Sequence, residues 1–177
     1  MMRKEIFIHF AFWASFFIFI AVAKGFLNLA SWPFWVGGIV GTILPDVDHF
    51  IYIYLLRPQE LTSQRANRMM NNKDVLGTLR ILAETRYERT KIIFHTATFQ
   101  LIFTILTFWV LTSSGGIFGR GVVLAFLLHM LVDEAVDLSE MGNLGNWFRN
   151  FPVSFERREK QYLAANFIVF LLFSFFL

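Results

Sequence analysis

Five long apolar stretches constrain the fold of this chain more than any other feature. They cover about residues 6–23, 34–56, 92–112, 121–138 and 162–177. A helix crosses the hydrocarbon core of a membrane with about 20 residues, at about 1.5 Å per residue. The chain is also 56% hydrophobic and 18% aromatic, whereas soluble domains are about 45–50% apolar. We therefore predict a single all-α domain over residues 1–177, a polytopic membrane bundle of about five transmembrane helices.

The first apolar stretch has two interpretations. Its end, Ala21-Val22-Ala23, has the small-x-small pattern of a signal-peptide cleavage site. Its apolar part is long for a signal peptide, however, and it contains His9. We expect the stretch to be retained as a transmembrane helix.

The polar insert at residues 57–91 indicates the orientation of the bundle. The insert, the N-terminus and the loop before the last stretch carry most of the lysines and arginines. By the positive-inside rule, the N-terminus is cytoplasmic, the C-terminus lies outside, and no nucleic-acid partner is expected. Within the insert, apolar residues at helical spacing predict an amphipathic helix from Asp74 to Glu88. This helix either lies on the lipid headgroups or packs, solvated, on the domain.

The second apolar stretch ends in a run of ionisable residues, Leu44-Pro45-Asp46-Val47-Asp48-His49. We expect Pro45 to break or kink the helix there. Earlier in the same stretch, Gly37 and Gly41 form a small-xxx-small spacing that permits close helix contact. An ionisable side chain in the hydrocarbon costs roughly 3 kcal/mol by insertion scales, which makes such residues functional candidates.

Polar residues of three other stretches fall at the same predicted depth, near the cytoplasmic face. His9 and His95 lie near the cytoplasmic ends of their stretches, and His129, Asp133 and Asp137 follow one helix face at i, i+4 and i+8. So many carboxylates and imidazoles in apolar surroundings need a cation, and no lysine or arginine lies close to them in the stretches. The predicted metal ligands are His9, Asp46, Asp48, His49, His95, His129 and Asp133.

Two further acidic residues are predicted to support this site, and one is not. Glu5 stands one helical turn before His9 and can orient its ring, as carboxylates commonly do for metal-bound histidines. Asp137 either caps the fourth helix or belongs to the same outer layer of the site. Glu134 points away from the His129 face, and we expect it at the membrane interface.

The order of these residues resembles the LexA-regulated inner-membrane metal-dependent hydrolase family. The resemblance is carried by His9, by Leu44-Pro45-Asp46-Val47-Asp48-His49, by His95-Thr96 and by His129-x3-Asp133. That family is distantly similar to zinc-dependent phospholipase C and P1-type nucleases, which are helical and hold clustered zinc ions with His and Asp. The family's usual His-Arg-Gly-x-Thr-His stretch reads Thr90-Lys91-Ile92-Ile93-Phe94-His95 here, so only its second histidine is present.

These observations favour a membrane-embedded hydrolase that cleaves a phosphoester of a lipid or lipid-linked substrate at the cytoplasmic leaflet of the inner membrane. One to three divalent ions are expected, with zinc best suited to His and Asp ligands and manganese or iron as alternatives. Asp48 would bridge ions or act as the base, and Arg89 and Lys91 would hold the phosphate. Two alternatives remain: a non-catalytic membrane scaffold with a structural metal, and a proton or metal transporter.

Overall fold

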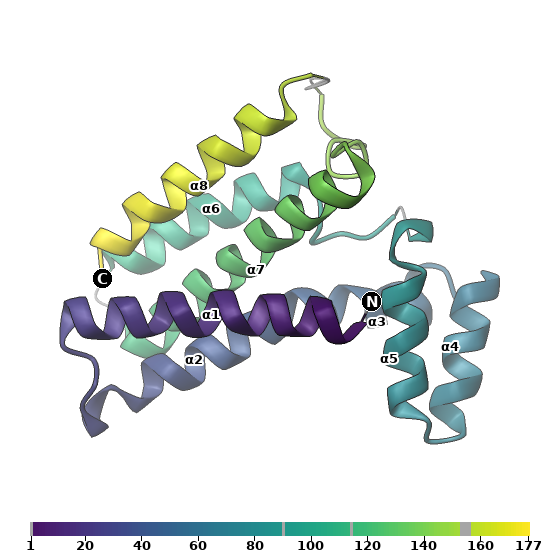
Figure 1. Ribbon diagram of the computed structural model, residues 1–177, viewed down its shortest axis with the longest axis horizontal. Coiled ribbons are helices and arrows are strands. Elements are labelled where there is room, and N and C mark those ends of the chain that lie inside the picture. The colour runs from purple at the N-terminus through teal and green to yellow at the C-terminus, as the bar shows by residue number, and fades with distance from the viewer. Residues whose placement is uncertain (1, 90, 114, 153–156) are drawn as a thin grey trace.

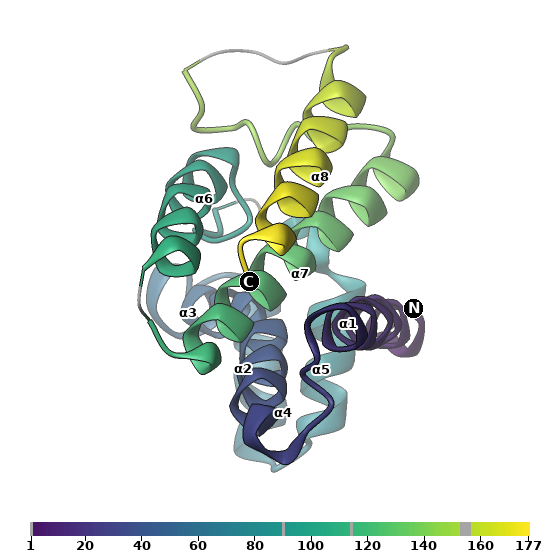
Figure 2. The same cartoon turned by 90° about the vertical axis from the view of Figure 1, so that its left-hand side faces the viewer.

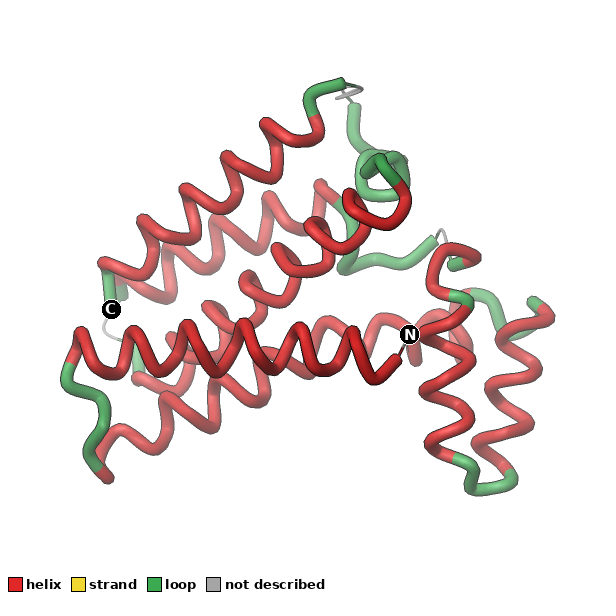
Figure 3. The backbone as a smooth tube through the Cα atoms, viewed as in Figure 1, coloured by secondary structure: helices red, strands yellow, loops and turns green. Residues whose placement is uncertain are grey.

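The computed structural model describes residues 2–89, 91–113, 115–152 and 157–177, and their side chains except those of residues 2–6 and 87. Within these ranges every regular element is a helix (Figure 3), which confirms the all-α prediction. The five long helices are α1 (Met2–Lys24), α2 (Trp32–Ile43), α6 (Ala97–Thr112), α7 (Ile117–Met141) and α8 (Glu159–Phe175). Figure 2 shows α7 between the pair α1 and α2 and the pair α6 and α8.

The second apolar stretch is a helical rod with a break at Pro45. The α-helix α2 ends at Ile43 and gives way to a 3₁₀ turn, η2 (Leu44–Asp46). The rod continues as a short α-helix, α3 (Val47–Ile51), and a π-helical turn, η3 (Tyr52–Leu56). The predicted break is confirmed, and its cause is that proline has no N–H to donate within a helix. As a result the Asp46 to His49 segment departs from the regular course of α2.

The closest helix contact in the bundle is between α2 and α7. A Cβ atom on Gly37 would meet the backbone carbonyl of Phe118, and one on Gly41 would meet that of Val122. From the opposite side, a Cβ on Gly121 would meet the backbone carbonyl of Phe34. These glycines therefore allow the two backbones to touch, as the small-xxx-small spacing predicted. This contact sets the position of α7, and so of its polar residues, along the axis of α2.

The insert folds as two helices that stand across one end of the bundle (Figure 1). They are α4 (Leu61–Asn71), which the sequence analysis did not predict, and α5 (Val75–Glu84), followed by a 3₁₀ turn, η4 (Arg86–Glu88). The predicted helix does begin after Asp74, whose side chain accepts a 2.8 Å hydrogen bond from the backbone N–H of Gly77. Its α-helical part ends at Glu84, four residues earlier than predicted. Figure 1 also shows the N-terminus at the α4–α5 end and the C-terminus at the opposite end.

Two helical segments, Phe7–Lys24 and Leu29–Leu56, are long and apolar enough to cross a membrane. Only 22% and 28% of their most apolar windows are buried inside the protein, so most of these apolar side chains face outward. The other three expected spans are also helices, but α6 and α8 have only 16 and 17 residues. The fourth, α7, is long but carries several acidic residues toward its end.

Candidate metal centre

Three side chains from two helices form a compact set of metal-ligand atoms. His9 comes from α1, and His129 and Asp133 lie one turn apart on α7. Nε2 of His9 is 3.2 Å from Oδ1 of Asp133, and Nε2 of His129 is 3.2 Å from Oδ2 of the same carboxylate. Ligand atoms around a tetrahedral zinc ion, with bonds of 2.0–2.1 Å, are about 3.3 Å apart. One ligand atom from each residue lies within 4.8 Å of the others, so this group can hold a metal ion.

The remaining predicted ligands lie around this group. Nε2 of His95 is 2.8 Å from Oδ2 of Asp133, and Oδ1 of Asp46 is 3.7 Å from Nε2 of His129. The ring of His49 stacks on that of His95 with centroids 5.2 Å apart. The structure therefore brings the predicted residues of four separate apolar stretches together, and which of them bind an ion stays a prediction.

Asp48 lies behind His95 and is fully buried. Its Oδ1 accepts a 3.1 Å hydrogen bond from the backbone N–H of Ile93, and its Oδ2 accepts one of 2.6 Å from Phe94. Oδ2 is also 3.4 Å from Nδ1 of His95. Both oxygens thus accept hydrogen bonds from the segment before α6, and Asp48 does not line the cavity described below. These contacts hold that segment and orient the His95 ring, and the bridging or basic role of Asp48 stays a prediction.

Asp48 and His95 form one carboxylate–imidazole pair of the site, and the predicted pairing of Glu5 with His9 stays a prediction. The side chain of Glu5 lies outside the described residues. The backbone next to His95 is also held in place. Thr96 caps α6, and its hydroxyl accepts a hydrogen bond from the N–H of Phe99. Ala97 donates its N–H to the carbonyl of Trp147, at 2.8 Å.

Arg86 is a site residue that the sequence analysis missed. Its Nη2 is 2.9 Å from Oδ1 of Asp133 and 3.0 Å from Oδ1 of Asp137. Sequence reasoning found no lysine or arginine close to these carboxylates within the apolar stretches, and the insert folds back and supplies an arginine from η4. Arg86 falls within the amphipathic helix predicted from Asp74 to Glu88, and no local pattern there indicates that its side chain reaches the cluster.

Arg89, which was predicted to hold the phosphate, is buried beside His49. Its Nε donates to Nδ1 of His49 at 3.4 Å, and its Nη1 donates to the hydroxyl of Thr85 at 3.0 Å. A neutral His49 ring that accepts at Nδ1 carries its proton on Nε2, which is then a donor. His49 is accordingly suited to hydrogen-bond an oxygen atom. Lys91, predicted to act with Arg89, is exposed and does not line the cavity.

Asp137 belongs to the outer layer of the site and is not the cap of its helix. Its Oδ2 accepts a 2.8 Å hydrogen bond from Nε1 of Trp147, and the Trp147 ring packs edge-on against His95 with centroids 5.9 Å apart. The helix continues for another turn to Met141 and ends at Gly142, whose φ of 73° gives a left-handed cap. Trp147 was not predicted, because it lies in an irregular loop.

A cavity of about 480 Å³ opens from this cluster between α1, α2 and α5. The wall of the cavity is polar at the cluster, and most of the rest of it is apolar. The polar part is formed by His9, Asp46, His49, Arg86, Arg89, His129 and Asp133. The apolar part is formed mainly by Phe10, Trp13, Ile39, Ile43, Phe50, Leu79, Leu82 and Ala83.

A second polar cluster lies on the other side of α7 and centres on Glu134. This side chain is fully buried, so the expectation of an interfacial position was wrong. Nδ2 of Asn166, on α8, lies 3.1 and 3.2 Å from its two carboxylate oxygens and 3.1 Å from Oε1 of Gln100, on α6. The hydroxyl of Tyr162 also donates to Gln100. The pocket beside this cluster measures only about 10 Å³.

Comparisons of the chain with protein-family models, curated proteins and solved structures find no match. The function of the chain is therefore inferred from the geometry of the site and from the sequence pattern.

Proposed function

We propose that this protein is a membrane-embedded, metal-dependent phosphoester hydrolase. The observation that carries the proposal is the His9, His129 and Asp133 group at the wall of a cavity that two arginines also line. A saturated structural site has no need of such a space, whereas a catalytic site keeps a position open for substrate. The resemblance in residue order to the inner-membrane hydrolase family supports the same conclusion.

The proposed ion is zinc, held by His9, His129 and Asp133. Two imidazoles and one carboxylate are typical of catalytic zinc sites, and manganese or iron would also accept these ligands. His95 contacts Asp133 from another side, and Asp46 reaches toward His129, so these two residues are the ones that would serve additional ions. When bound, the ion would supply Lewis-acid chemistry to water and to phosphoryl oxygens.

The residues around the proposed ion have separable tasks. Arg86 and Arg89 would hold phosphate oxygens through charge-assisted hydrogen bonds. The Nε2–H of His49 would donate to a phosphoryl or leaving-group oxygen. Asp46 has an exposed side chain on the cavity wall, so it would accept the proton of the attacking water. This is the role that the sequence analysis gave to Asp48, whose oxygens are engaged elsewhere.

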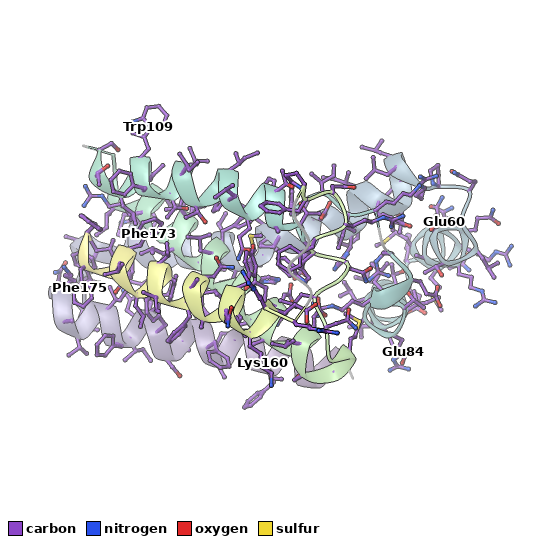
Figure 4. The ribbon with its side chains drawn as sticks, turned by 90° about the horizontal axis from the view of Figure 1, so that it is seen from above. Glu60, Glu84, Trp109, Lys160, Phe173 and Phe175 are labelled. Carbon is purple, nitrogen blue, oxygen red and sulfur yellow. The ribbon has the colours of Figure 1, made fainter. Side chains whose placement is uncertain are left out.

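The proposed location is the inner membrane, with all five long helices crossing it and the N-terminus in the cytoplasm. The outer faces of α6 and α8 support this, since Ile105, Trp109, Ile168 and Phe175 are all exposed apolar residues. Figure 4 shows the labelled Trp109 and Phe175 toward one end of the molecule and Glu60 and Glu84 toward the other. Asp133, Glu134 and Asp137 of α7 are enclosed by the other helices, which would keep them from the lipid.

The test uses the whole protein purified in detergent. Metal content is measured by mass spectrometry, and hydrolysis is measured on a soluble aryl phosphate, a long-chain lysophosphatidate and a phosphatidate. We expect at least one bound divalent ion per chain and turnover that stops with a chelator and returns with zinc. The variant His129→Gln should lose both ion and turnover, whereas Glu140→Gln, at an exposed position near the end of the same helix, should keep both.

The same preparation separates the alternatives. A tightly held ion without hydrolysis of any phosphoester would overturn the proposal in favour of a structural metal in a scaffold. Zinc or proton flux in proteoliposomes, again without hydrolysis, would overturn it in favour of a transporter.

A further inference from the structure

We propose that the substrate lipid enters the cavity sideways from the bilayer, through a portal between α1 and α2, and that its apolar chain stays in this portal during the reaction. The portal is formed by Phe10, Trp13, Ile39 and Ile43. The inference rests on the proposed function for the phosphate end of the substrate. It adds where the apolar end binds and from which side the molecule arrives.

Exposure identifies the opening. Phe10, Ile39 and Ile43 line the cavity and are nevertheless 59%, 48% and 59% exposed. Cavity-lining side chains with so much exposed surface mark the part of the wall that lies next to the outside of the protein. The segments that contain these helices are long and apolar enough to cross a membrane, so in the proposed membrane location this part of the surface would face lipid chains.

The end of the cavity toward the insert is covered. Leu79, Leu82 and Ala83 of α5 and Arg86 of η4 form that wall, and Leu82 is buried. The wall formed by α5 and η4 is held to α4, because the hydroxyl of Thr62 on α4 donates a 2.5 Å hydrogen bond to Glu88 of η4. The cavity wall is also exposed at Asp46, where a soluble compound could enter, so the apolar side between α1 and α2 is the route whose chemistry suits a lipid chain.

The chemistry of the cavity selects an amphiphile. Arg86 and Arg89 place two guanidinium groups in the polar part of the wall, which matches a phosphate. The portal matches a hydrocarbon chain. A soluble phosphoester can use only the polar part, so the chain contributes binding that a soluble compound lacks.

The first experiment narrows the portal. In Ile39→Trp a larger side chain fills the opening, and Ile43→Trp repeats the test at a second position. The matched control is Ile105→Trp, on the outward face of α6 and 64% exposed. We expect both portal variants to lower kcat/KM for a long-chain lysophosphatidate by about tenfold or more. Hydrolysis of the soluble aryl phosphate should change less than about twofold, because it does not depend on chain burial, and the control should leave both substrates unaffected.

The second experiment does not depend on turnover. A lysophosphatidate with a photoreactive diazirine near the middle of its chain is mixed into phosphatidylcholine vesicles that contain the protein. Illumination should attach the lipid to peptides of α1 and α2 that contain the portal residues. An excess of unlabelled lysophosphatidate, but not of lysophosphatidylcholine, should compete.

The two experiments distinguish failure of the inference from failure of the proposed function. Portal labelling without hydrolysis of any phosphoester would support the inference and contradict the hydrolase proposal. Hydrolysis of the long-chain substrate that both portal variants leave unchanged, with labelling spread over other helices, would overturn the inference while the hydrolase proposal stands.

Discussion

Two neighbouring carboxylates on α7 have opposite environments, although both are buried. Asp133 meets His9, His95, His129 and Arg86, and it lines a cavity of about 480 Å³. Glu134 meets the amide of Asn166 beside a space of about 10 Å³, which is about the minimum for one water molecule. Figure 2 shows why, since α7 has α1 and α2 on one side and α6 and α8 on the other.

The comparison shows that burial of a carboxylate does not by itself mark a functional site. Buried polar groups are normally satisfied by hydrogen bonds, and an amide network achieves this for Glu134 as part of helix packing. Asp133 differs because its partners are metal-ligand atoms and a guanidinium, and because there is room for a substrate next to it. The partners of a buried carboxylate and the volume of the adjacent cavity distinguish a candidate functional site from a polar contact that only packs helices together.

The largest expected effect separates the two residues directly. Asp133→Asn removes the carboxylate that both histidines of the proposed ion contact, and Glu134→Gln is the matched change one residue away. We expect the first to lose the ion and to lower turnover of lysophosphatidate by more than about a hundredfold, since even outer partners of metal ligands are worth about 10–100-fold. The second should retain the ion and most of the turnover. Equal loss in both variants would show that the comparison is wrong.

A smaller effect is expected at Asp48, which holds His95 from behind. Asp48→Asn keeps the size of the side chain but exchanges one acceptor for a donor. Two backbone N–H groups that now meet oxygens would then compete for one. We expect turnover to fall by about 10–100-fold, while the ion content stays close to that of the unchanged protein. Complete loss of the ion would restore Asp48 to the bridging role predicted from the sequence.

The convergence of the site could be predicted from the sequence because few variables decide it. The apolar stretches and the positive-inside rule predict a common depth for His9, His95 and His129, and helical periodicity predicts the face that Asp133 shares with His129. The break at Pro45 and the close approach at Gly37 follow from local chemistry in the same way. Each of these features depends on the residue itself and its near neighbours.

The rest of the site depends on tertiary contacts that no local pattern records. Arg86 and Trp147 reach the cluster from a polar insert and from a loop, where side-chain direction is set only when the segment packs. The engagement of Asp48 requires backbone N–H groups 45 and 46 residues away. The burial of Glu134 had a signal in the sequence, since Gln100 and Asn166 are uncharged polar residues within apolar stretches and can serve as its partners.

Arg86 and Lys91 provide a finer test of which cations belong to the site. Arg86→Met removes the guanidinium that contacts Asp133 and lines the cavity, whereas Lys91→Met removes an exposed charge from the same insert. We expect Arg86→Met to raise KM for lysophosphatidate by about tenfold, which corresponds to about 1.4 kcal/mol of lost phosphate binding, and Lys91→Met to have little effect. Ion content should not fall in either variant, because Arg86 and the ion would both draw on Asp133. A larger rise in KM for Lys91→Met would support the phosphate site predicted from the sequence.

The smallest effect on turnover is expected on the far side of α7, where the readout is stability. Asn166→Leu removes the amide that joins α8 to Glu134 and Gln100. A buried carboxyl group then loses its donor, which costs about 1–3 kcal/mol. The matched control, Gln161→Leu, changes an exposed residue at the start of α8. We expect the thermal midpoint in detergent to fall for Asn166→Leu and to stay near that of the unchanged protein for the control. The proposed ion lies on the opposite side of α7 from Asn166. Ion content and turnover of Asn166→Leu, measured at low temperature, should therefore change less than about twofold. The loss of packing acts on the folding equilibrium and not on the site. A loss of ion in this variant while it remains folded would mean that the two faces of α7 are coupled and that Glu134 belongs to the site.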